Sequence, residues 1–179
     1  TGWSVNEVCT WFENIEFKMY VPKAKFFGLT GLLLLKAVDA NNDLDLLRKK
    51  LKIANEFHRK KLTLAANELF YGLPIPSTLN GNIPINKPVF SQYLEEVNHE
   101  YLNSISEIDI GWVLRWLDDI GLPQYKEKFQ INLFDGRMIE LLTLQDLINL
   151  GVKSELHYSS FRRSIELLRY LDYEKEFFI

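Results

Sequence analysis

Hydrophobic residues recur at helical spacing along most of the chain. Near the N-terminus the apolar positions follow one another at i, i+3, i+4, i+7 and i+10, as Val5, Val8, Cys9, Phe12 and Ile15. This spacing predicts an amphipathic helix, and Ser4 followed by Glu7 forms a capping box that would start it. No segment shows sustained alternation of polar and apolar positions with β-branched residues. The pattern therefore predicts an all-α protein.

The same apolar pattern occurs twice. The segment Trp11–Tyr20 reappears 105 residues later as Trp116–Tyr125. A second match follows in the same order, pairing Leu51-Lys52-Ile53 and Phe57-His58 with Leu150-Gly151-Val152 and Leu156-His157. Because an internal repeat divides a chain into like units, we expect two domains of one fold, residues 1–71 and 106–179.

Each repeat unit predicts five helices. After the N-terminal helix, the first unit has Tyr20–Phe27, a short apolar piece Leu32–Val38, a helix through Leu44 to Leu51, and a last helix capped by Asn55. The second has a helix capped by Asp109, then Tyr125–Leu133, a turn at Asp135-Gly136, Met138–Leu142, Leu144–Leu150 and Glu155–Leu171. The first unit is six residues longer, around Asp39 to Asp43.

Two different segments join the units. Residues 72–88 contain four prolines and two glycines, which predicts a linker without a stable helix. In residues 89–105, by contrast, large apolar side chains recur at helical spacing, as Phe90, Tyr93, Leu94, Val97, Tyr101 and Leu102. We expect an extra helix here that packs on one or both units.

Charge divides unequally between the units. Residues 1–72 carry 11 Lys and Arg against 8 Asp and Glu, whereas residues 104–179 carry 9 against 13. The net charge of −3 thus hides a basic first unit and an acidic second one. Opposite charge on two copies of one fold favours contacts with partners or between domains, and solvated helix faces are the alternative reading.

Candidate catalytic groups are few. His58 and His157 hold equivalent repeat positions, which favours packing or capping, and His99 lacks a second histidine at the spacing of a helical metal site. Cys9 lies on an apolar stripe and is expected to be inert, and a single cysteine fits a reducing compartment. Trp11 and Trp116 are expected to anchor the two cores. We predict no enzyme, no metal and no cofactor.

The order of elements resembles a known family. Two five-helix units with an aromatic-rich first helix, and a long last helix that starts near Phe57-His58 or Leu156-His157, resemble tandem SAM (sterile alpha motif) domains. More narrowly, two sets of motifs look like the first and second SAM repeats of the liprin-β family. They are Val8-Cys9-Thr10-Trp11 with Leu51-Lys52-Ile53 and His58–Leu62, and Trp112–Lys126 with Asp135–Met138. The first unit departs from the SAM pattern at Lys52, where a glycine is usual.

The resemblance implies a scaffold that assembles with other SAM proteins, such as liprin-α, in the cytoplasm at adhesion sites or presynaptic active zones. It also implies contact surfaces, namely an acidic middle region on one partner and the start of the last helix on the other. The basic candidates in the first unit are Lys49, Lys50, Lys52, Arg59 and Lys60. The acidic candidates in the second unit are Asp118, Asp119, Asp135, Glu140 and Asp146.

Two other functions are compatible with the sequence. Some SAM domains bind RNA hairpins, and the basic segment 48–61 could contact phosphates, although the sequence pI of about 5.7 argues against it. Unlike surfaces on one molecule could also form head-to-tail homo-oligomers. The longest strongly apolar run, Phe26–Leu35, is too short to span a bilayer. We expect neither membrane insertion nor a small-molecule substrate.

Overall fold

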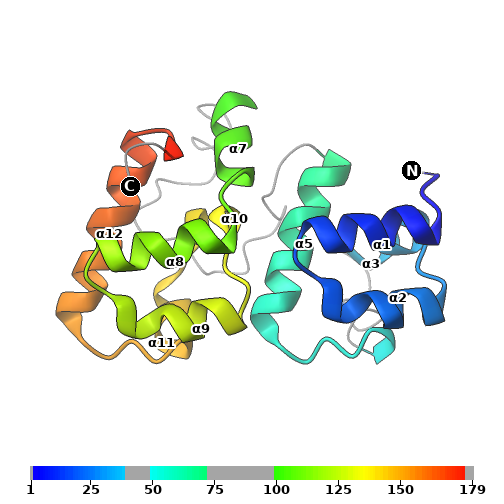
Figure 1. Cartoon of the computed structure of the whole chain (residues 1–179), viewed down its shortest axis with the longest axis horizontal. Helices are drawn as coiled ribbons and strands as arrows, with labels where there is room; N and C mark the ends of the chain where they lie inside the picture. Colours follow the sequence, from blue (N-terminus) through cyan, green and yellow to red (C-terminus); the bar gives the residue numbers. More distant parts are fainter. Residues whose placement is uncertain (1, 39–48, 72–98, 176–179) are drawn as a thin grey trace. The chain divides into compact units, whose positions relative to one another are not determined.

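The computed structural model describes residues 2–38, 49–71 and 99–175 (Figure 1). The chain divides into two compact units, Thr1–Thr78 and Leu79–Ile179. Within the described ranges all regular secondary structure is helical. The predicted all-α class with two tandem helical bundles is therefore confirmed.

The first unit begins with a helix whose start the sequence predicts correctly. Its elements are α1 (Val5–Asn14), the 3-10 turn η1 (Lys18–Tyr20), α2 (Val21–Phe27), α3 (Gly31–Val38) and α5 (Glu56–Tyr71). The Ser4 hydroxyl accepts a hydrogen bond from the Glu7 amide, and the Glu7 carboxylate accepts one from the Ser4 amide at 2.7 Å. The capping box thus satisfies two amides that the helix itself cannot. α1 packs on α2 and buries Val8, Cys9 and Phe12.

The last helix of the first unit also starts where predicted. The side-chain oxygen of Asn55 accepts hydrogen bonds from the amides of Phe57 (2.8 Å) and His58 (3.3 Å). From there α5 buries Phe57, Leu62 and further small residues against the core. The predicted turn at 41–43 and most of the helix from Leu44 to Leu51 lie outside the described residues.

The second unit likewise has only helical secondary structure in its described residues. Its elements are α7 (His99–Ser106), α8 (Ile110–Asp119), η2 (Pro123–Tyr125), α9 (Lys126–Ile131), α10 (Gly136–Glu140), α11 (Leu144–Asn149) and α12 (Glu155–Tyr170). Asp109 caps α8 as predicted, through a 2.7 Å hydrogen bond from the Trp112 amide. The structure differs at Asp135, which caps α10 directly because its carboxylate accepts from the Met138 amide.

α7 is the described part of the extra helix predicted at 89–105. It packs on α10 within the second unit, where Ile105 and Ile108 are buried. The predicted linker 72–88 and residues 89–98 lie outside the described residues, so the proposed boundaries there stay predictions.

The repeat extends from sequence to hydrogen bonds. In the first unit the Gly31 amide donates to the Trp3 carbonyl, and in the second the Gly136 amide donates to the Ile108 carbonyl, both at 3.0 Å. Each pair occupies corresponding positions, because the offset is again 105 residues. The two units therefore share tertiary contacts as well as an apolar pattern.

The expectation that Trp11 and Trp116 play the same role needs correction. Trp116 is fully buried and packs against Phe161, with ring centroids 6.1 Å apart. Trp11 is only half-buried and lies against Trp3, while the adjacent Phe12 fills the core. The position lies at the border of the buried stripe, so a sequence pattern cannot decide how far its side chain is covered.

Candidate protein-interaction surfaces

The predicted basic residues gather around the start of α5 in the first unit. Lys49, Lys50 and Lys52 are exposed in the segment that precedes the helix, and Arg59 and Lys60 are partly exposed in its first turns. The Lys50 ammonium lies 5.1 Å from the ring centre of Phe27 at the end of α2. This surface, the α5 basic rim, therefore extends toward α2.

Arg59 has a structural role within this rim. Its guanidinium donates hydrogen bonds to the carbonyls of Ile53 (2.9 Å) and Ala54 (2.6 Å), which ties down the loop before α5. Charged hydrogen bonds of this kind are stronger than neutral ones. The guanidinium is thus already engaged, and Lys49, Lys50 and Lys52 are the more accessible cations of the rim.

Lys61 is buried, although it belongs to the basic segment 48–61. It is not among the predicted contact residues. Lys61 is 1% exposed, and its ammonium pairs with the Glu16 carboxylate at 2.9 Å. The pair joins α5 to the loop after α1, across 45 residues of sequence. A buried charge must be paired, so Lys61 contributes to the fold and not to a surface.

The predicted acidic residues of the second unit do not form one surface. Asp118 and Asp119 are exposed at the end of α8, and Asp118 pairs with Lys126. Asp146 belongs to a capping box with Thr143 at the start of α11. Asp135 is buried, caps α10 and pairs with Arg137 at 2.9 Å.

Glu140 is buried at the centre of a polar cluster. Its carboxylate accepts hydrogen bonds from the Arg169 guanidinium (2.9 Å) and from the hydroxyls of Tyr173 (2.7 Å) and Tyr101 (3.0 Å). Burial lowers the pKa of Arg169, but the charge and hydrogen bond of Glu140, together with Tyr173 and Tyr101, more than offset this, so the net pKa is raised. Glu140 and Asp135 thus hold the fold together, and the exposed acidic candidates reduce to Asp118 and Asp119.

The structure also exposes large apolar side chains that the sequence reasoning did not select. Phe26 at the end of α2 is 96% exposed, and Leu156 in the first turn of α12 is 78% exposed. The residue of the first unit that corresponds to Leu156 is Phe57, and it is buried. Exposed apolar groups beside charges are typical of contact surfaces. In the sequence, the lysines at positions 23 and 25 could have indicated that Phe26 lies on the exposed side of its helix.

The described residues contain no arrangement suited to catalysis. The hydroxyls of Tyr20 and Tyr125 are hydrogen-bonded at 2.8 Å to Nδ1 of His58 and His157, which confirms the packing role of both histidines. Cys9 is buried, and burial raises the pKa of its thiol. No group of three potential metal ligands occurs in the described ranges.

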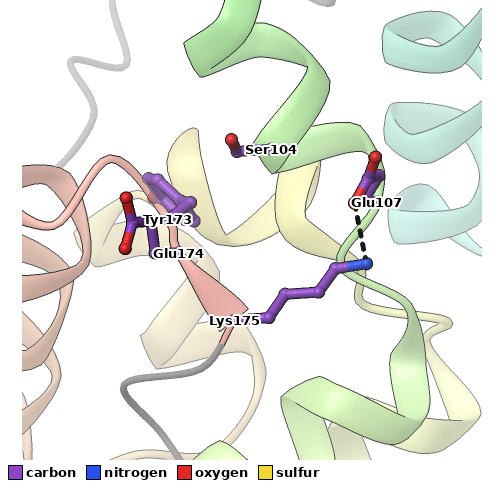
Figure 2. Close-up of a pocket in the computed structure, with 5 residues that line it drawn as sticks. All are labelled: Ser104, Glu107, Tyr173, Glu174 and Lys175. Atoms are coloured by element: carbon purple, nitrogen blue, oxygen red, sulfur yellow. Dashed lines mark ion pairs between the residues drawn. The ribbon is translucent and has the colours of Figure 1, made fainter.

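A cavity of about 400 Å³ lies in the second unit between α7 and the C-terminal turn (Figure 2). It is lined by Ser104, Glu107, Tyr173, Glu174 and Lys175. The Lys175 ammonium pairs with the Glu107 carboxylate at 3.1 Å across it. The lining thus combines this ion pair with Ser104, Glu174 and a tyrosine whose hydroxyl is already bonded to Glu140.

Comparisons with known proteins agree with the repeat. Two family models, both described as SAM domain (Sterile alpha motif), match residues 1–69 and 109–169. Among the described helices, none combines the length and apolarity needed to cross a membrane.

Several curated proteins are similar over most of the chain. Human Liprin-beta-1 is 36% identical over 172 residues, which is 96% of this chain and 14% of that protein. Kazrin-A of Danio rerio is 30% identical over 97% of this chain and 19% of its own length. Human Liprin-alpha-1 is 31% identical over 73% of this chain and 10% of its own length. The chain thus spans less than a fifth of each relative.

Together these similarities indicate a protein-interaction scaffold segment without enzymatic activity. The chain belongs to the family of SAM (sterile alpha motif) domain proteins and carries two such domains in tandem.

Proposed function

We propose that this chain joins a SAM protein of the liprin-α type through its two domains, using the α5 basic rim of the first and Asp118 and Asp119 of the second. The observation that carries the proposal is the division of exposed charge between two copies of one fold. In the first domain Lys49, Lys50 and Lys52 are exposed beside the start of α5.

Charge of this kind acts mainly on the encounter between partners. Complementary rims raise the association rate and disfavour wrong registers, while a few apolar anchors supply most of the affinity. Two domains in one chain also add their contacts, because binding by one raises the effective concentration of the other.

The resemblance to liprin-β supports two wider proposals. The chain works in the cytoplasm, at adhesion sites or presynaptic active zones, and its natural partner is itself a SAM protein.

The domains extend over residues 1–71 and 106–179, with the linker 72–88 and a helix at 89–105 that associates with at least one of them.

Charge reversal in the first domain tests the proposal. The variant Lys49→Glu/Lys50→Glu/Lys52→Glu should weaken binding to the region of human Liprin-alpha-1 that is similar to this chain at least tenfold in calorimetric titration. Exposed charge pairs contribute about 0.2–1 kcal/mol each, and reversal replaces attraction by repulsion. The same titration of Asp118→Lys/Asp119→Lys tests the second surface.

Lys36→Glu serves as the control, because this lysine is exposed on α3 of the same domain. It should leave the affinity within about twofold, as expected for one exposed charge that is not part of the α5 basic rim. Absence of binding by the unaltered chain would reject the partner. Equal affinity for all variants would reject the two surfaces.

A further inference from the structure

The outward side of α2 in the first domain carries an aromatic side chain between lysines. α2 buries Val21 and Ala24, so Pro22 and Phe26, one helical turn apart, lie on the opposite side. Phe26 is 96% exposed, and Met19 just before the helix is 51% exposed. Three exposed lysines surround them, so we call the following set the α2 face: Lys18, Met19, Pro22, Lys23, Lys25 and Phe26.

The second domain shows that the fold does not require these side chains. In α9, at the corresponding positions, Ala24 is replaced by Phe129, and both residues are fully buried. The outward positions differ, because Met19, Pro22 and Lys25 correspond to Gln124, Glu127 and Gln130. Ile131, which corresponds to Phe26, is 57% exposed. The first domain therefore exposes more apolar surface and more positive charge here than this fold needs.

Nearby lysines lie along aromatic rings. The Lys23 ammonium is 5.7 Å from the ring centre of Tyr20, and that of Lys50 is 5.1 Å from Phe27, the residue after Phe26. Lys50 belongs to the α5 basic rim, so the α2 face continues that rim with an apolar centre. The combination of a central aromatic residue and flanking cations complements an acidic protein surface.

We infer that the α2 face is the apolar anchor of the first domain in its contact with an acidic surface of a SAM partner. This inference rests on the function proposed above and adds the residue that contributes most to affinity, Phe26. The lysines of the α2 face then pair with carboxylates at the rim of the contact, where they guide association.

A membrane is the less suitable occupant. One myristoyl chain gives only marginal, reversible membrane binding. Phe26 and Met19 together offer less apolar surface than such a chain. The three lysines add attraction to anionic lipid, but the apolar surface is too small for stable attachment.

Replacement of Phe26 tests the inference against the same region of human Liprin-alpha-1. We expect Phe26→Ser to raise the Kd at least tenfold in calorimetric titration, because a central aromatic anchor is lost. Ile131→Ser at the corresponding position of the second domain is the matched control and should stay within about twofold. Since Phe26 is almost wholly exposed, thermal unfolding should show an unchanged first domain.

A second variant separates charge from apolar contact. Lys25→Glu should weaken binding mainly at low ionic strength, because salt screens exposed charges, whereas the Phe26→Ser effect should not depend on salt. Binding by the unaltered chain with no change in Phe26→Ser would overturn the inference and leave the proposed partner in place. Failure of the unaltered chain to bind would overturn both.

Two further measurements address other occupants of the α2 face. Sedimentation of the chain alone should give the same mass for the unaltered protein and Phe26→Ser, and self-association that depends on Phe26 would overturn the inference in favour of a second copy. Vesicles of phosphatidylserine and phosphatidylcholine should not bind the chain. Binding to these vesicles that depends on Phe26 would overturn the inference in favour of a membrane.

Discussion

Single residues in left-handed backbone conformation mark corresponding loops in both domains. Glu16 corresponds to Gly121, Leu133 to Gly28 and Lys52 to Gly151, and all six have positive φ between 52° and 84°. In each pair one member is a glycine, for which this conformation carries little penalty. For the other member it costs roughly 1–2 kcal/mol. The loop geometry is thus imposed by the fold, and the unusual Lys52 keeps the backbone shape that glycine adopts at position 151.

Tyr173 gives a prediction about pH. Removing its hydrogen bond to Glu140 in Tyr173→Phe should cost about 1.5–3 kcal/mol of unfolding free energy at pH 8, as expected for a bond to a charged group. Burial raises the pKa of Tyr173 well above its ordinary value of 10.0, so the folded state retains a proton that the unfolded state loses. The stability that Tyr173 adds to the folded state is therefore full below pH 10 and declines as the pH rises further.

The difference in unfolding free energy between the unaltered chain and Tyr173→Phe should therefore narrow between pH 8 and pH 10.5. Urea unfolding followed by circular dichroism measures it. Tyr170→Phe is the control, because Tyr170 is 84% exposed and its replacement should leave the unfolding free energy almost unchanged. A constant difference across this pH range would contradict the assigned role of Tyr173.

At the scale of elements, the contact between α7 and α10 depends on a glycine. A Cβ atom at Gly136 would meet the carbonyl oxygen of Ile105 and would lie 2.8 Å from the Cβ of Ile108. Both neighbours are backbone or adjacent to it, so they cannot move aside cheaply. Gly136 also donates its amide to the Ile108 carbonyl at 3.0 Å. α7 is thus held against α10 at a distance that only glycine permits.

Gly136→Ala should therefore destabilise the second domain by about 2–4 kcal/mol, within the range for overpacked positions and broken backbone contacts. The unfolding midpoint in urea measures this directly. Gly2→Ala, where an added Cβ meets nothing within 4 Å, should leave the midpoint unchanged. Equal midpoints for both variants would show that α7 can shift without loss.

At the scale of the whole molecule, two compact units predict two separate responses to mutation. Ile105→Ala removes a fully buried side chain and should cost about 2–5 kcal/mol. In the full chain, hydrogen exchange followed by mass spectrometry should show faster exchange in α8 to α12 and unchanged exchange in α1 to α5. Leu29→Ala, also fully buried, should produce the reverse pattern.

Faster exchange throughout the chain after either substitution would contradict independent units. Protection unchanged in α8 to α12 after Ile105→Ala would instead place α7 outside the second domain. We expect α7 to unfold together with the second domain, because it packs on α10 although it precedes residue 109, where the matched family model begins.

Most of the helical architecture could be predicted from sequence, because helix caps and apolar stripes are local. Ser4, Asn55 and Asp109 act as caps as expected, since each needs only a partner two or three residues away. The surfaces could be predicted less well. Exposure of a charged side chain depends on residues far along the chain, which a local pattern does not contain.

The sequence by itself determined the class of fold, the duplication and the opposite charge of the two halves, because each follows from composition or local spacing. The tertiary structure decided which charges are available. Glu140 is buried by partners 29 to 39 residues away, and Lys61 by one 45 residues away. It also decided that Phe26 is exposed while its neighbours Ala24 and Leu29 are buried, because packing covers one side of α2 only.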